Sequence, residues 1–457
     1  MRKLILALIL VSSFAVLAIG AWLFVDNARG KQQWLAWRAE RTAQGDRFEW
    51  RELAPPGVPD AENFAMAPLI AGAVRGKDLD PRFKALEPPK LEKEWGDWRA
   101  GQRANLRACA AAYKTQDLLQ ALAPLTLALH ELDEASRRPR CRIPVNYAEQ
   151  EYPSLLGFRS AVRTLRLRAL VNLSQGRSEP ALEDVLTCLR IADHLKAEPN
   201  LIVTLLRNAI LSLAIQPVWE GQLDHRWNER QLSILQEALQ REDLLASTRL
   251  GFEGERLNSV QTFIATAEGL PGPACGREGS ASKPAAPLGW FAKRWFYRNL
   301  LEMDRFHAAG FLDVIHPASH RVFPDKAVDP VKWIKDHRFR KDLVLAQIAI
   351  PALLGQIERA ARIQSGLDQA AVACALERHR LATGSYPASL AELAPATGTQ
   401  DLVNGQSLHY QRREKGYLLY SVGWDRVDEG GRVAWNAEPK PALDPAHGDW
   451  TWMNTTP

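Results

Sequence analysis

The residues best suited to do chemistry in this sequence are histidines that lie close to carboxylates. The stretch 130–134, His-Glu-Leu-Asp-Glu, begins like the H-E-x-x-H helix of zinc proteases, but a glutamate stands where the second histidine ligand belongs. A second group is interrupted by Pro317, which breaks the helix that would align its three histidines, His307, His316 and His320. We therefore expect neither group to hold a metal ion.

Other linear signatures of catalysis are also missing from the sequence. It contains no G-x-S-x-G elbow, no Walker A loop and no G-x-G-x-x-G turn. Its five cysteines include no C-x-x-C pair, and a bridge such as Cys109 to Cys141 stays open because sequence separation does not give the distance between Cα atoms. No motif in the sequence thus identifies the protein as an enzyme. A hydrolase whose site is assembled from distant residues and a purely structural envelope protein remain alternatives.

A basic stripe on one predicted helix is the best candidate for binding a partner. Apolar residues recur every three and four positions over 155–173, and Arg159, Arg163 and Arg166 adjoin that apolar face. A second amphipathic helix follows, which predicts a helical hairpin. We expect a groove between this hairpin and the apolar segment 201–218, where the arginines would meet an acidic protein partner.

The same hairpin resembles one tetratricopeptide repeat. Gln175-Gly176 followed by Ala181 matches the Q-G-x-x-x-x-A step at the turn of that repeat. No second copy follows at a fixed period, and solenoids need several copies to bury a continuous core. We therefore expect a repeat-like hairpin inside a larger helical domain.

The overall composition is that of a folded protein with more than one core. Its 457 residues should divide into roughly two or three domains, and 46% of them are hydrophobic. The net charge is only +5, with lysine and arginine interspersed among aspartate and glutamate. We expect no nucleic-acid binding from this charge pattern.

An apolar run at the N-terminus predicts a membrane anchor. Residues 4–25, LILALILVSSFAVLAIGAWLFV, carry no charge and follow Arg2 and Lys3. As a helix they would span about 30 Å, the thickness of a bilayer hydrocarbon core. A cleaved signal peptide is the alternative, because 18–20 is a weak cleavage site, but the run is longer than a typical signal sequence. We predict an uncleaved anchor at 1–30 with the bulk of the chain outside the cytoplasm.

Helical periodicity dominates residues 31–340. Within this helical body a Gly-, Pro- and Ser-rich segment at 269–288 predicts a flexible loop. The segment 201–218 is apolar enough for a second membrane span, but Arg207 and Asn208 lie at its centre, where an unpaired charge costs at least about 2.5 kcal/mol. We predict instead a buried central helix that ends at Pro217.

The region 341–435 combines a long helix with two strands. Helical spacing extends over 348–381, and the segments 407–413 and 417–422 read as strands joined through Lys415-Gly416. A tail, 436–457, follows. The predicted fold is thus mainly α, with an N-terminal transmembrane helix, a multi-helix body and a small C-terminal α+β module that has a short antiparallel sheet.

This C-terminal module resembles the globular part of the major, G-type pseudopilins of type II secretion. Gly384, Tyr386 and Pro387 match a G-x-Y-P turn after the long helix, and Asp401 with Asn404-Gly405 matches the next turn. Residues 419–423 match an L-Y-S-x-G strand that runs into an acidic glycine-rich loop. Leu402 replaces an expected proline, and the N-terminus lacks the G-F-T-L-x-E cleavage signature. What transfers is therefore a fold module and not a polymerising role.

The resemblance implies a calcium site and a cellular location. In the family the loop after the last strand binds calcium, and Asp425 and Asp428 would supply hard oxygen ligands here. The alternative is an exposed acidic turn that caps the sheet. The whole chain also looks like uncharacterised envelope proteins of Gram-negative bacteria, which implies a single-pass inner-membrane protein with a periplasmic body. We expect a role in protein binding or assembly with an envelope partner.

Overall fold

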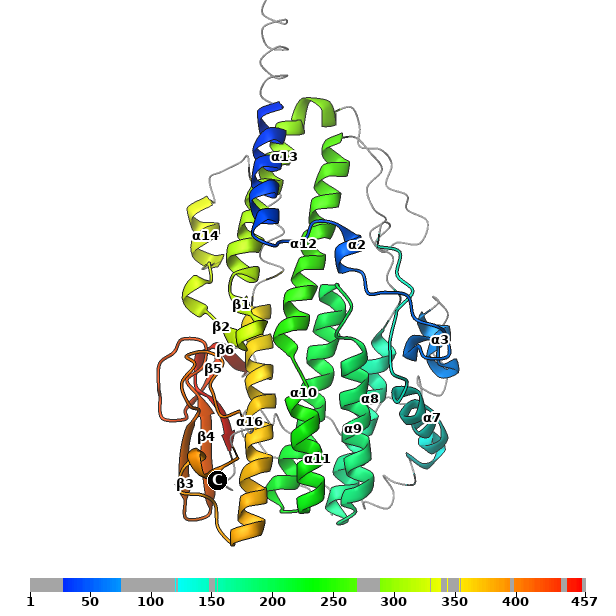
Figure 1. The fold of residues 1–457 in the computed structure, drawn as a ribbon, viewed down its shortest axis with the longest axis vertical. Coiled ribbons are helices and arrows are strands. Elements are labelled where there is room, and N and C mark those ends of the chain that lie inside the picture. The colour runs from blue at the N-terminus through cyan, green and yellow to red at the C-terminus, as the bar shows by residue number, and fades with distance from the viewer. Residues whose placement is uncertain are drawn as a thin grey trace, which may run out of the picture.

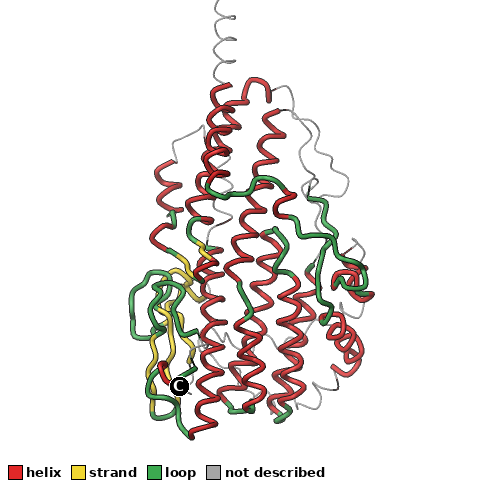
Figure 2. Tube along the Cα trace, in the orientation of Figure 1, coloured by secondary structure: helices red, strands yellow, loops and turns green. Residues whose placement is uncertain are grey.

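The structure, a computed structural model, describes residues 28–74, 122–147, 155–268, 288–328, 330–337, 355–394, 398–436 and 442–453, with residues 120, 153, 343 and 353. Most of these residues are helical, and a small set of antiparallel strands lies beside the helices (Figure 1, Figure 2). The mainly helical class and the small C-terminal sheet are confirmed. The predicted anchor at 4–25 and nearly all of the predicted loop at 269–288 lie outside the described residues.

Five consecutive helices form the central bundle. They are α8 (Leu156–Ser174), α9 (Ser178–His194), α10 (Leu201–Leu223), α11 (Glu229–Gln240) and α12 (Leu244–Glu268). α8 and α9 form the predicted hairpin, and Gly176 at its turn has φ +73°, a left-handed conformation that costs glycine little. Ala181 is fully buried where the two helices close on each other. The small side chain of Ala181 allows the two helices to pack closely, which explains why an alanine follows Gln175-Gly176 at this spacing.

The central helix α10 is buried as predicted but does not end at Pro217. It is long and apolar enough to cross a membrane, yet 78% of its most apolar window is buried inside the protein. Arg207, in its first half, forms an ion pair with Glu242 and donates a hydrogen bond to Ser247 Oγ at 2.7 Å. The prediction of a helix end at Pro217 is wrong. A proline inside a helix costs about 3 kcal/mol, and burial of Val218 and Trp219 beyond it offsets this cost.

The long helix α16 (Gln356–Thr383) lies between the bundle and the sheet (Figure 1). It packs against α10, α11 and α12 on one side and against strands of the C-terminal module on the other. Gly384, with φ +83°, ends the helix. The following turn is fixed because the hydroxyl group of Tyr386 donates to Glu377 on α16. The G-x-Y-P segment therefore folds the chain back onto the helix that precedes it.

The C-terminal module extends further along the chain than its predicted boundary at 435. β3 (His409–Arg413) and β4 (Gly416–Ser421) form the predicted hairpin, and β7 (Trp450–Met453) pairs with the other edge of β4. β5 (Val433–Asn436) and β6 (Ala442–Gly448) form a second antiparallel pair. The segment 436–457 is therefore not a separate tail. Its described part, residues 442–453, completes the sheet, because the buried side chains of Trp450 and Trp452 on β7 need a partner surface.

Buried apolar residues form two clusters, which we call the lower and upper cores. The lower core joins α8–α11 with α16 and the sheet, so the module and the bundle share it. The upper core joins the helix at 28–43, hereafter the N-terminal helix, with α12, α13 (Leu288–His307) and the hairpin β1 (Ile315–His316) and β2 (Arg321–Val322). Shorter helices flank both cores: α2 (Trp50–Leu53), α3 (Pro68–Val74), α7 (Thr126–Ser136) and α14 (Pro330–His337).

A buried ion network fixes the N-terminal helix in the upper core. Arg256 on α12 is 1% exposed and lies 2.6 Å from both Asp46 Oδ2 and Asp304 Oδ1. Arg41 binds the same oxygen of Asp46 at 2.6 Å, and Trp37 Nε1 donates to Asp304 Oδ2 at 2.6 Å. Removing one partner of such a pair leaves a buried charge, which costs roughly 3–5 kcal/mol. The position of the N-terminal helix is therefore strongly determined.

Candidate functional site

The acidic loop, residues 423–431, lies between β4 and β5 and is closed by the turn between β6 and β7. Gly423 has φ +71°, and a Cβ atom there would collide with the carbonyl oxygen of Gly448. Asp425 Oδ2 accepts a hydrogen bond from the Gly448 amide at 3.0 Å, and the Asp449 amide donates to Arg432 O at 2.8 Å. The two turns therefore form one compact unit, and residue 449 contacts loop residues that lie 18 and 20 positions earlier in the sequence.

The two aspartates predicted as calcium ligands have different surroundings. Asp425 faces the turn at Gly448. Asp428 Oδ1 instead accepts hydrogen bonds from the Tyr420 hydroxyl group at 3.0 Å and from the Gly430 amide at 2.9 Å. Its Oδ2 lies 3.5 Å from His409 Nδ1, and these donors lower the pKa of Asp428. Of the predicted pair, only Asp425 contacts the second turn, and its Oδ1 also accepts a hydrogen bond from the Val427 amide at 3.1 Å.

Two further carboxylates join this group: Glu429 lies in the acidic loop, and Asp449 lies in the turn between β6 and β7. Asp449 is 1% exposed, and its Oδ2 accepts hydrogen bonds from the amides of Gly431 at 2.6 Å and Glu429 at 3.1 Å. Asp449 Oδ1 and Glu429 Oε2 are buried atoms with no hydrogen-bond partner. Burial raises the pKa of both groups, and the facing charges of Asp425 and Asp449 raise that of Glu429 further. The loop therefore gathers three carboxylates in one place, and the nearby His447 responds to them: its hydrogen bond to Asp444 and the charges of Asp425 and Glu429 raise its pKa.

This donor set fits calcium better than a transition metal. Calcium takes six to eight oxygen ligands at about 2.3–2.6 Å and accepts irregular geometry. Asp425, Glu429 and Asp449 offer only oxygen atoms, two of which lack partners, and loop carbonyls and water would complete the shell. A bound calcium ion would neutralise the facing carboxylates and hold the two turns together. Sequence reasoning missed Asp449 because it lies in the segment interpreted as a tail; no local signal connects it to the loop.

The predicted basic stripe is not one continuous surface. Arg159 is exposed, whereas Arg163 and Arg166 are half-buried. Arg166 Nη1 donates to Gln216 Oε1 on α10 at 3.1 Å, so this side chain reaches the helix that was expected to form the opposite wall of a groove. α8 and α10 pack directly against each other. Within the described residues, the stripe thus joins two helices at one end and faces solvent at the other.

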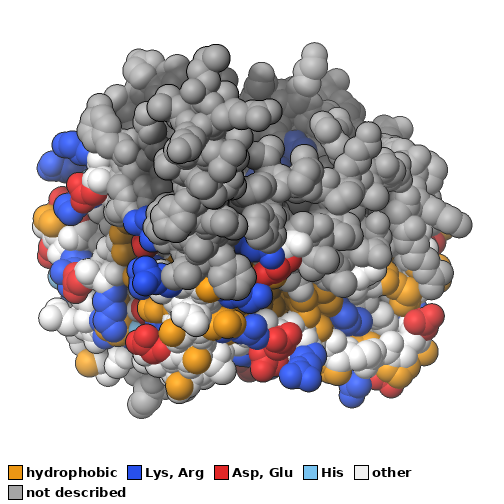
Figure 3. Space-filling view, turned by 90° about the horizontal axis from the view of Figure 1, so that it is seen from above, with side chains coloured by type: hydrophobic (Ala, Val, Ile, Leu, Met, Phe, Trp, Pro, Cys, Tyr) orange, Lys and Arg blue, Asp and Glu red, His pale blue; other side chains and the backbone are white. Residues whose placement is uncertain are grey.

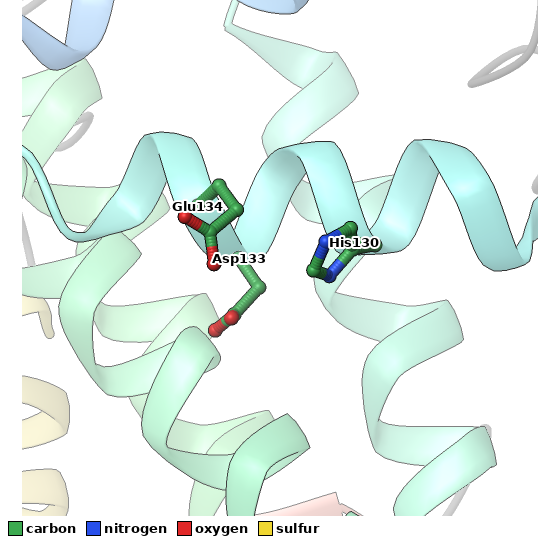
Figure 4. Close-up of side chains that lie close together, drawn as sticks. All are labelled: His130, Asp133 and Glu134. Carbon is green, nitrogen blue, oxygen red and sulfur yellow. The ribbon is translucent and has the colours of Figure 1, made fainter.

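The cluster His130, Asp133 and Glu134 on α7 is held by arginines. Its possible ligand atoms all lie within 4.8 Å of one another, and Asp133 points toward the neighbouring helix (Figure 4). There Asp133 Oδ1 binds Arg190 and accepts a hydrogen bond from Thr187 at 2.6 Å, while Oδ2 binds Arg137 at 2.9 Å. A metal ion would have to displace two guanidinium groups from this carboxylate. The expectation that 130–134 is no zinc-protease site agrees with this geometry.

Several other buried carboxylates are held by basic or hydroxyl partners of their own. Asp184 binds Arg168, Glu242 binds Arg207, and Glu198 accepts a hydrogen bond from the Tyr147 hydroxyl group at 2.7 Å. His307 is fully buried beside Phe252 and Phe311, and burial lowers its pKa to about 4. Among the described residues, these groups give no support to an assembled hydrolase site.

Comparison of the chain with family models, with curated proteins and with solved structures gives no match. The resemblances to pseudopilins and to a tetratricopeptide repeat therefore stay predictions from the sequence. Any conclusion about function must therefore rest on the structure of the chain itself.

Proposed function

We propose that this chain is a single-pass, inner-membrane protein with a periplasmic body that acts in protein binding or assembly within the envelope. The carrying observation is the position of α16, which is enclosed by α10, α11 and α12 on one side and by the sheet on the other. A helix buried on both sides by its own chain is not available for polymerisation. The module would therefore act as a fixed domain of a larger protein and present its acidic loop and sheet to a partner.

The placement in the membrane is supported by elimination among the apolar segments. α10 passes a length and hydropathy test for a membrane span, but it is mostly buried and carries the Arg207–Glu242 pair. The remaining candidate is the uncharged run at 4–25. A relation to secretion or pilus systems follows from the resemblance of the C-terminal module and belongs to this proposal.

Two measurements test the proposal. Alkaline phosphatase fused after residue 457 should be active, because that enzyme matures only outside the cytoplasm; an inactive fusion at normal expression would contradict the orientation. Tagged full-length protein, cross-linked in its native envelope and purified in detergent, should recover secretion or pilus components. The variant Asp425→Asn with Asp449→Asn is the matched control for partners that bind through the acidic loop. Purification of a partnerless monomer would count against an assembly role.

A further inference from the structure

His307 is a buried ionisable residue for which the structure provides no hydrogen-bond partner. It is the last residue of α13, and its exposed fraction is 0%. Neither of its ring nitrogens, Nδ1 and Nε2, has a partner. The centroid of the Phe311 ring lies 5.2 Å from that of the imidazole ring, and the centroid of the Phe252 ring lies 6.4 Å away. Buried polar groups are nearly always hydrogen-bonded, so this exception needs a physical reason.

The backbone changes its hydrogen-bond pattern directly after His307. Residues Ala308–Leu312 form a π-helical turn, η5, in which the Asp313 amide donates to a carbonyl oxygen five residues earlier at 2.8 Å. Such turns are rare and occur frequently at functional sites. This turn carries Phe311, whose ring stacks on Phe252 of α12 with centroids 4.3 Å apart. The π-helical turn thus builds the aromatic surroundings of the imidazole ring.

His194 in the lower core shows the contrast with His307. Its ring also packs on a phenylalanine, Phe64, but its Nε2 lies 2.8 Å from the carbonyl oxygen of Ser136. A hydrogen bond of this kind can form in the neutral and in the charged imidazole. A proton on His307 would instead create two buried N–H donors without acceptors, which is unfavourable. His307 is therefore held neutral, and burial lowers its pKa to about 4.

Besides burial, two charged groups of the ion network act on the pKa of His307. Asp304, one turn earlier on α13, raises it, and Arg256 on α12 lowers it. Both oxygens of Asp304 already accept hydrogen bonds: Oδ1 from Arg256 Nε at 2.6 Å, and Oδ2 from Arg256 Nη2 at 2.7 Å and from Trp37 Nε1 at 2.6 Å. Trp37 lies on the N-terminal helix, and Arg256 also binds Asp46 at 2.6 Å. The carboxylate available to a protonated His307 thus belongs to the network that fixes the N-terminal helix.

We propose that His307 is a proton-sensitive switch, which releases the N-terminal helix from the upper core when the surroundings become acidic. The imidazolium would place a second cation beside Arg256 and would compete with Arg256 and Trp37 for Asp304, so the contact of the N-terminal helix would break. Because the pKa of His307 is lowered in the docked state, docking is fully stable above the ordinary value of 6.5 and weakens as the pH falls toward about 4. Neither the membrane anchor nor the proposed partner enters this switch.

Hydrogen exchange of the full-length protein in detergent, measured by mass spectrometry, tests the switch. Between about pH 7.5 and about pH 5, the opening equilibrium constant of the amides in residues 28–43 should rise about 25-fold, because His307 has a pKa of about 4 when docked and 6.5 when released. The exchange rates are first corrected for the intrinsic effect of pH on amide exchange. A rise of less than about threefold in the wild type would overturn the proposal.

His307→Phe removes the proton site and places a third ring in the aromatic surroundings. It leaves the outer surface unchanged, where described basic and acidic side chains are interspersed in the view from above (Figure 3). This variant should show a rise of less than about threefold between the same pH values. His307→Leu serves the same purpose if the phenylalanine ring is too large for the site. A folded variant of either kind that keeps the whole rise would overturn the proposal.

His316→Gln is the matched control in the same part of the molecule. His316 is half-buried and packs edge-on against Phe323, and its Nε2 lies 3.1 Å from the carbonyl oxygen of Asp313, a contact that a glutamine amide can replace. The control should keep the wild-type rise. If the rise is lost in His316→Gln and kept in His307→Phe, the proton binds at His316 and the assignment to His307 is wrong.

Discussion

Two acidic clusters of this molecule have similar composition but opposite electrostatic states. On α7, the carboxylate of Asp133 is shared by Arg137 and Arg190. In the acidic loop, the charge of Asp449 acts on Glu429, and each of the two carboxylates has a buried oxygen to which no described group donates. The pKa of Asp133 is lowered because its hydrogen bonds and arginines outweigh burial, whereas the pKa of Asp449 is raised by burial. The two clusters thus differ in whether each carboxylate oxygen has a donor, and not in how close the acids lie to one another.

This difference explains why the tighter cluster is the weaker metal candidate. The ligand atoms on α7 lie within 4.8 Å of one another, a condition that the loop carboxylates do not meet. Opposite ligands of a calcium ion lie up to about 5 Å apart, so a more open arrangement suits that ion. A cation entering the loop would relieve repulsion, while a cation entering the α7 cluster would have to break two ion pairs.

The largest expected effect is stabilisation of the wild-type protein by calcium. A ligand that binds only the folded state at about 100 times its Kd stabilises by roughly 2.7 kcal/mol. We expect calcium, and not magnesium, to raise the thermal midpoint and to slow amide exchange over 423–431. Asp449→Asn should abolish both effects, because it keeps a hydrogen-bond acceptor for Gly431 and removes the charge. Asp133→Asn is the control and should respond like the wild type. A calcium-independent wild type would remove the loop as a calcium site.

An intermediate effect is expected from Asp133→Asn itself. The substitution leaves the half-buried Arg190 without its charged partner, which should cost roughly 1–3 kcal/mol in urea unfolding, with or without calcium. Because the folded pKa of Asp133 is lowered, its contribution is fully present above the unfolded value near 4 and is lost as pH falls through the folded pKa. The difference between wild type and variant should therefore stay constant from about pH 7 to pH 5 and shrink below about pH 4. A difference that changes between pH 7 and pH 5 would contradict the pairing.

Helices and strands could be predicted from the sequence, but contacts between turns that lie far apart in the chain could not. The hairpin α8–α9, the burial of α10 and the strands β3 and β4 follow from periodicity and from local turn residues, and all three predictions are confirmed. The pairing of β7 with β4 joins segments about thirty residues apart, and no local pattern encodes it. The same long-range pairing brings Asp449 to the acidic loop. Likewise, Pro217 signals a helix end locally, but tertiary packing continues α10 through it.

The smallest expected effect comes from Asp428→Asn and tests which aspartates belong to the loop site. Asp428 is exposed, and its hydrogen bonds with Tyr420 and Gly430 lie outside the group formed by Asp425, Glu429 and Asp449. Exposed ionic contacts contribute about 0–1 kcal/mol, so stability without calcium should change little. The calcium response should be retained, with affinity reduced only by the loss of one nearby charge. If Asp428→Asn abolished the response and Asp449→Asn preserved it, the ligands would be the pair expected from the sequence, and the orphaned oxygen of Asp449 would need another explanation.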